Sequence, residues 1–86
     1  IFWISPPHLK NPEHERYLIH TRHIIKHSAM LLNIHYLDIN QPHILGTQWQ
    51  SVIHNETVRT DDGIHITRKG GVRVIREVVK ILNGQD

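Results

Sequence analysis

The chain contains no cysteine in its 86 residues. This absence excludes a disulfide framework, a thiolate zinc site and a cysteine nucleophile, and it leaves the redox compartment undetermined. Any catalytic nucleophile in this chain must therefore be an oxygen atom.

Long apolar runs and clustered charges are also missing. No apolar run approaches the roughly 20 residues that span a bilayer, and the start of the chain is too short and lacks the basic flank of a signal peptide. The chain has ten Lys and Arg and eight Asp and Glu, and its basic residues do not form a cluster in the sequence. We therefore expect a single small soluble domain over residues 1–86, with neither a membrane nor a nucleic acid as its partner.

The first forty residues predict a strand, a helix and a second strand. Residues 1–4 form an apolar run, which favours a strand buried on both faces, and its abrupt start suggests part of a longer protein. Asn11 can cap a helix whose first residue is Pro12, ending near Asn33. Residues 34–39 read as the next strand. This order is typical of the βαβ unit of a parallel sheet.

The predicted helix is amphipathic. We expect its core face to consist of Tyr17, Leu18, Thr21, Ile24, Ile25, Ser28 and Leu32. The opposite face carries Arg16 and three histidines, His20, His23 and His27. Three imidazoles at this spacing could chelate zinc, copper or nickel, but no carboxylate has matching spacing, so a solvated face is favoured and no metal site is predicted.

The second half begins with an irregular stretch over residues 41–62, in which residues 49–53 could form a short helical turn. Thr67 can cap a last helix that runs to about Leu82 and is closed by Gly84. We expect that helix to bury two stripes against the sheet, Val72, Ile75, Val79 and Leu82 in one and Val74, Val78 and Ile81 in the other.

The segment Asp62-Gly63-Ile64-His65 is the strongest candidate for chemistry. A general base near neutral pH is most often a histidine, and it needs an acceptor that fixes its tautomer. Asp62, three residues earlier across a glycine turn, could be that acceptor. The alternative is a plain turn with a surface histidine, which is the commoner meaning of an isolated Asp-x-x-His.

With its surroundings, this block resembles the carboxyl-terminal part of SGNH (GDSL-type) serine esterases and acylhydrolases. The block Asp62-Gly63-Ile64-His65-Ile66-Thr67, the Pro-Pro turn after the first strand and the last helix with an early glycine occur in the family's order. The resemblance implies an α/β fold, namely part of a flavodoxin-like three-layer α/β/α sandwich with a parallel sheet. It also implies that His65 is the catalytic base and Asp62 its orienting acid, with no cofactor.

The chain departs from that family in one respect that decides its activity. The family's nucleophilic serine and oxyanion-hole residues lie in earlier blocks that are absent here, and Ser5, Ser28 and Ser51 lack the required setting. We therefore expect no esterase activity from this chain alone, and action on a small-molecule ester, of a carbohydrate or a lipid, when it is completed. The alternatives are a non-catalytic interaction module, which associates with itself or a complementary chain, and a histidine-rich metal-binding domain.

Overall fold

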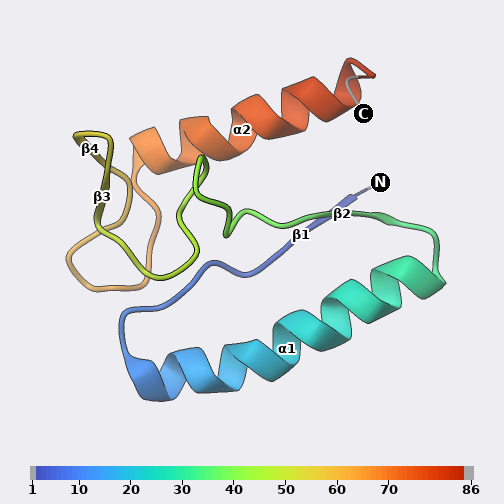
Figure 1. Cartoon of the computed structure of the whole chain (residues 1–86), viewed down its shortest axis with the longest axis horizontal. Helices are drawn as coiled ribbons and strands as arrows, with labels where there is room; N and C mark the ends of the chain where they lie inside the picture. Colours follow the sequence, from blue (N-terminus) through green and yellow to red (C-terminus); the bar gives the residue numbers. More distant parts are fainter. Residues whose placement is uncertain (1, 85–86) are drawn as a thin grey trace.

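The computed structural model describes residues 2–84, in which two helices lie on opposite sides of a pair of strands (Figure 1). The elements follow in the order β1 (Phe2–Ile4), α1 (Pro12–Leu31), β2 (His35–Leu37), β3 (Val52–Ile53), β4 (Glu56–Thr57) and α2 (Arg68–Leu82). The chain is a small α/β domain with a short parallel sheet.

The strands β1 and β2 pair in parallel, with Phe2 opposite His35 and Ile4 opposite Leu37. The predicted βαβ unit is therefore confirmed, although Ile1 lies outside the described residues. The expectation that the first strand is buried on both faces is wrong, because Ile4 is 46% exposed. Its strand has a single neighbouring strand within residues 2–84, so one edge of β1 has no strand beside it.

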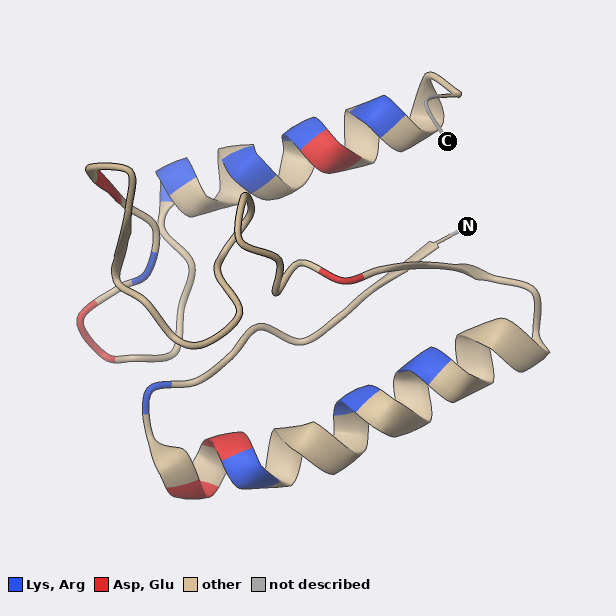
Figure 2. Cartoon of the chain, viewed as in Figure 1, with Lys and Arg blue, Asp and Glu red and all other residues tan. Residues whose placement is uncertain are grey.

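Helix α1 begins as its sequence predicts. The side chain of Asn11 accepts hydrogen bonds from the backbone N–H groups of Glu13 and His14 at 2.9 and 3.2 Å, and Pro12 occupies the first turn. Acidic residues lie in that first turn, where their negative charges interact favourably with the positive end of the helix dipole (Figure 2). The helix ends at Leu31, two residues before the predicted end.

The buried face of α1 differs from the predicted one. Leu18, Ile25 and Ser28 are partly buried as expected. The other expected core residues, Tyr17, Thr21, Ile24 and Leu32, are exposed. The face that meets the rest of the chain is centred on Ala29 and Arg22, because Arg22 forms a half-buried ion pair and the short sheet covers only a narrow stripe of the helix.

Residues 49–53 do not form the expected helical turn. Instead, β3 and β4 make an antiparallel hairpin in which Val52 faces Thr57 and Ile53 faces Glu56. The two connecting residues, His54 and Asn55, both have positive φ values of 50° and 67°. Two consecutive residues of this kind match the right-handed twist of a two-residue hairpin, which a helical turn cannot provide.

The hydrophobic core lies between the sheet and α2. It joins Leu37, Ile39, Ile44, Leu45, Ile53, Val58 and Val74, with Phe2, Ile66, Val78 and Ile81 packed against it. The stripe of α2 that contains Val74 is thus buried as predicted. The second predicted stripe is not, since Val72, Ile75, Val79 and Leu82 remain exposed. Two strands are too narrow a surface to cover both stripes.

Candidate active site

The Asp62–His65 block lies in a tight loop between β4 and α2. Arg59 and Ile66 form an antiparallel bridge at the base of the loop. Above it, the N–H of Thr60 donates to the carbonyl of His65 at 3.0 Å, and the N–H of Gly63 donates to the carbonyl of Thr60 at 3.1 Å. The loop is therefore closed by its own backbone.

Within this loop the two predicted site residues are in direct contact. His65 Nδ1 lies 2.6 Å from Asp62 Oδ2. This distance lies within the range expected for an organised acid–base pair. The other carboxylate oxygen accepts from the N–H groups of Ile64 and His65 at 2.9 and 3.2 Å and from the hydroxyl of Thr60. Asp62 is therefore held at both of its oxygens.

These contacts fix the charge of the aspartate. The hydrogen bond from the Thr60 hydroxyl, followed by those from His65 and Ile64, lowers the pKa of Asp62 well below its ordinary value. An ionised carboxylate can only accept, so His65 Nδ1 must carry the proton in their shared hydrogen bond. In a neutral imidazole, Nε2 is then the atom with the free lone pair. That is the tautomer a general base needs.

The free face of the histidine is open. The side chain of His65 is 72% exposed and that of Asp62 is 46% exposed. Within residues 2–84, Nε2 of His65 has no hydrogen-bond partner. A substrate or a nucleophile from outside the loop can therefore reach it.

Gly63 is required at the tip of the loop for two reasons. Its φ of +73° belongs to the left-handed region, and a Cβ atom would lie 2.6 Å from Cβ of Lys10. The N–H of Lys10 donates to the carbonyl of Gly63 at 3.1 Å. The loop is thus in contact with the segment that leaves β1, near the carboxyl end of the parallel sheet (Figure 1). Ligands of open α/β sheets collect at this end of the strands.

The sequence analysis did not identify Arg59 as part of this loop. Its guanidinium is buried and donates hydrogen bonds to the carbonyls of His8, Ile64 and His65 at 2.6, 2.8 and 3.2 Å. The bridge between residues 59 and 66 brings it beneath His65. No motif or periodicity in the sequence marks it, because the three acceptors are backbone atoms.

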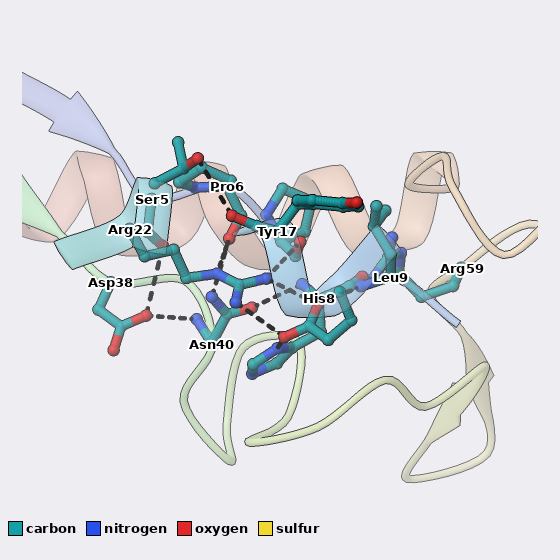
Figure 3. A network of polar contacts seen from close by, with 12 residues as sticks. Ser5, Pro6, His8, Leu9, Tyr17, Arg22, Asp38, Asn40 and Arg59 are labelled. Atoms are coloured by element: carbon teal, nitrogen blue, oxygen red, sulfur yellow. Dashed lines mark hydrogen bonds and ion pairs between the residues drawn. The ribbon is translucent and has the colours of Figure 1, made fainter. Parts of the chain in front are cut away.

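A second arginine network was also missed. Glu15 on α1 accepts from both terminal nitrogens of Arg22 at 2.8 and 2.9 Å, and from the N–H of Leu9 at 2.8 Å. Arg22 in turn donates to the carbonyls of Pro6 and Pro7 at 3.0 and 2.9 Å (Figure 3). Glu15 and Arg22 are seven residues apart, about two helical turns, so they lie on the same face of α1. This spacing of opposite charges is the sequence feature that could have indicated the pair.

The serine that directly follows β1 is unsuited to attack a substrate. Ser5 is 1% exposed, accepts from the N–H of Ile39 at 2.9 Å and donates to Asp38 at 3.3 Å. Asp38 also accepts from the N–H of Asn40 at 2.9 Å, so it caps the turn after β2. Ser5 therefore has a structural role.

His20, His23 and His27 are exposed on α1 as expected. Across residues 2–84, no group of three or more histidine, aspartate or glutamate side chains is arranged to hold a metal ion. Over the same residues, no helix combines the length and the apolar character needed to cross a bilayer.

Comparison with known proteins identifies the family. The model of the family described as "Protein of unknown function (DUF459)" matches residues 1–81, so the chain belongs to this family. No curated protein and no solved structure matches the chain. The assignment of a function therefore depends on the site itself.

Proposed function

We propose that this chain supplies the general base and its orienting acid to a Ser-His-Asp ester hydrolase. The observation that carries the proposal is the 2.6 Å contact between His65 Nδ1 and Asp62 Oδ2, which leaves Nε2 free and open. The resemblance to SGNH hydrolases and the position of the loop near the carboxyl end of a parallel sheet support it. On this proposal the chain is part of a three-layer α/β/α sandwich.

The proposed reaction assigns one role to each residue. His65 Nε2 takes the proton of a serine hydroxyl as the serine oxygen attacks the ester carbonyl, and it then returns that proton to the leaving alcohol. Water hydrolyses the acyl-enzyme by the same route. Asp62 holds the imidazole in the required tautomer and stabilises the imidazolium. The serine and the oxyanion donors come from a segment outside this chain, so the chain alone does not turn over ester.

The test uses the protein completed with a serine-bearing segment and a chromogenic ester as substrate. We expect His65→Ala to lower turnover by about 10²–10⁴-fold. Asp62→Asn should also lower it with the fold intact, because the amide favours the wrong tautomer. His23→Ala is the control, since His23 is exposed on α1, and it should leave turnover unchanged. Full activity in His65→Ala would overturn the proposal.

The structure also favours a docking function, which does not require catalysis. One edge of β1 has no strand beside it within residues 2–84. On one side of this edge, Ile4 and Ile39 line an open apolar groove with Val72, Ile75 and Val79 of α2. On the other side, Trp3 and Ile25 line a second apolar hollow. Parallel sheets are covered on both faces, so this surface fits another parallel strand with apolar neighbours on both sides.

We infer that the occupant is a complementary α/β segment that pairs in parallel with β1. Ile75→Lys in the groove should prevent its association, because Ile75 is 58% exposed and its replacement costs little in the free chain. Met30→Lys on α1, where Met30 is 69% exposed and lines neither hollow, is the matched control. The measurement is sedimentation of the chain mixed with the complementary segment, where we expect one joint species that Ile75→Lys abolishes and Met30→Lys retains. Separate species in the wild-type mixture, or pairing between two copies of this chain, would contradict this occupant.

A further inference from the structure

Arg59 combines deep burial with the absence of a carboxylate partner. The residue is 1% exposed, and no carboxylate within residues 2–84 lies at ion-pair distance from its guanidinium. A guanidinium stays charged in a protein, and a buried charge is costly unless hydrogen bonds compensate it. Three backbone carbonyls provide the direct contacts of that compensation here, and the charges of Asp62 and Glu15, beyond ion-pair distance, also act to raise the pKa of Arg59 against the effect of burial. The positions of the three carbonyls show what the arginine holds in place.

Two of the three carbonyls flank the base. Nη2 of Arg59 donates to the carbonyl of Ile64 at 2.8 Å, and Nε donates to the carbonyl of His65 at 3.2 Å. These carbonyls belong to the peptide units immediately before and after the Cα atom of His65. Fixing both units fixes the direction in which the His65 side chain leaves the backbone.

The third carbonyl ties the loop to the rest of the fold. Nη1 of Arg59 donates to the carbonyl of His8 at 2.6 Å, in the segment between β1 and α1 (Figure 3). That segment is itself anchored, since His8 Nδ1 lies 2.7 Å from Glu15 Oε2. The guanidinium therefore connects the base loop with an anchored part of the fold.

The exposed pair needs such support. Asp62 and His65 are both largely open to solvent, and an exposed ion pair contributes little to holding two side chains in one geometry. Their contact depends on where the backbone places them. The buried guanidinium of Arg59 holds the backbone of the loop through hydrogen bonds that solvent does not weaken.

We propose that Arg59 is the positioning residue of the base, because it holds the peptide units around His65 so that Nδ1 meets Asp62 and Nε2 faces the substrate. The proposal rests on the proposed function for its catalytic meaning. Its structural content can be tested separately, since the tautomer of His65 can be measured without turnover.

The first measurement is the ¹⁵N spectrum of the histidine rings in this chain, which contains the whole Asp62–His65 loop and its contacts with Arg59. In the wild type we expect one dominant His65 tautomer with a protected Nδ1–H. Arg59→Met should mix the two tautomers and remove that protection, because methionine fills the space but donates to none of the three carbonyls. Arg59→Lys keeps the charge but lacks the planar guanidinium that reaches three carbonyls, so it should also lose the protected Nδ1–H. This variant replaces Arg59→Met in the test if the methionine variant does not fold.

Arg73→Met is the matched control. The Arg73 side chain is only 12% exposed, and it donates to the carbonyls of His43 and Ile53 at 3.1 and 3.2 Å and to Glu56. It therefore resembles Arg59 in burial and in donating to backbone carbonyls, and differs in its additional ion pair with Glu56. It holds the β3–β4 hairpin instead of the base loop. Its loss should lower stability without changing the His65 tautomer.

Turnover separates the two proposals. Misplacement of the base should lower kcat of the Arg59 variants by about 10²-fold with little change in KM, since substrate binding is not altered. A folded Arg59→Lys protein with a wild-type His65 tautomer and wild-type kcat would overturn the positioning role. A disturbed tautomer in a protein whose wild type hydrolyses no ester would support that role and reject the proposed function.

Discussion

Replacing Glu15 by glutamine should destabilise the protein far more than replacing any exposed glutamate. Burial opposes the charged form of Glu15 and is the largest single influence on it. Hydrogen bonds from Arg22, Leu9 and His8 together outweigh it, and the pKa of Glu15 falls from 4.5 to about 2. At about 1.4 kcal/mol per pKa unit this shift corresponds to about 3 kcal/mol. The side chain is 21% exposed, so screening by water reduces the expected value to about 2 kcal/mol.

The sign of the pH dependence follows from the direction of the shift. A carboxyl group whose pKa is lower in the folded state stabilises the fold above its unfolded pKa, and this stabilisation is lost as the pH falls through the folded value. The difference between wild type and Glu15→Gln should therefore be full at neutral pH. It should shrink as the pH falls from about 4.5 towards about 2, where the wild-type carboxyl group becomes neutral.

Urea unfolding followed by circular dichroism at several pH values measures this difference. Glu13→Gln is the matched control, because Glu13 is 74% exposed and its nearest contact with Arg16 is 3.8 Å long. That substitution should change the free energy of unfolding by less than about 0.5 kcal/mol. If Glu15→Gln behaves like Glu13→Gln at neutral pH, the network does not stabilise the fold as argued.

Other substitutions test the packing of α2 and the outer face of α1. In Gly70→Ala the new Cβ would lie 2.3 Å from the carbonyl oxygen of Val58, so we expect a loss of about 2 kcal/mol in thermal unfolding. Gly71→Ala meets nothing within 4 Å and should be neutral or stabilise by about 0.5 kcal/mol, and equal midpoints for the two variants would refute this packing. Thr67→Ala removes the hydroxyl that caps α2 by accepting from the N–H of Gly70, and it should lower the free energy of unfolding by about 1 kcal/mol in the same assay. Added zinc should raise the midpoint of neither the wild type nor His23→Ala, and a zinc-dependent rise that His23→Ala abolishes would instead indicate a metal site.

The helix starts could be predicted from the sequence because their signals are local. The side chains of Asn11 and Thr67 cap the two helices as expected, and both caps act within three residues. The Asp62–His65 contact is local in the same sense, since Gly63 makes the turn that joins them. Its catalytic role remains a prediction.

The features that sequence reasoning missed depend on distant partners or unusual backbone. His54 and Asn55 form a turn with two positive φ values but no glycine, so nothing in their residue types predicts the hairpin strongly. The predicted core face of α1 is wrong in part because it does not include Arg22, whose side chain is largely buried. Its partners include the carbonyls of Pro6 and Pro7, which precede it by 16 and 15 residues and lie outside the helix, so helical periodicity does not reveal them.

The connection between β1 and α1 joins the two arginine networks that the sequence analysis missed. It has no regular secondary structure, yet the carbonyls of three consecutive residues, Pro6, Pro7 and His8, each accept from an arginine side chain. A buried carbonyl without a partner is costly, so Arg22 and Arg59 stabilise a path that backbone pairing does not. The two guanidiniums approach this connection from α1 and from the base loop. The position of His65 relative to the sheet is therefore set by these side chains together with the backbone hydrogen bond from Lys10 to Gly63. Substitutions at either arginine should affect it more than substitutions on the exposed faces of the helices.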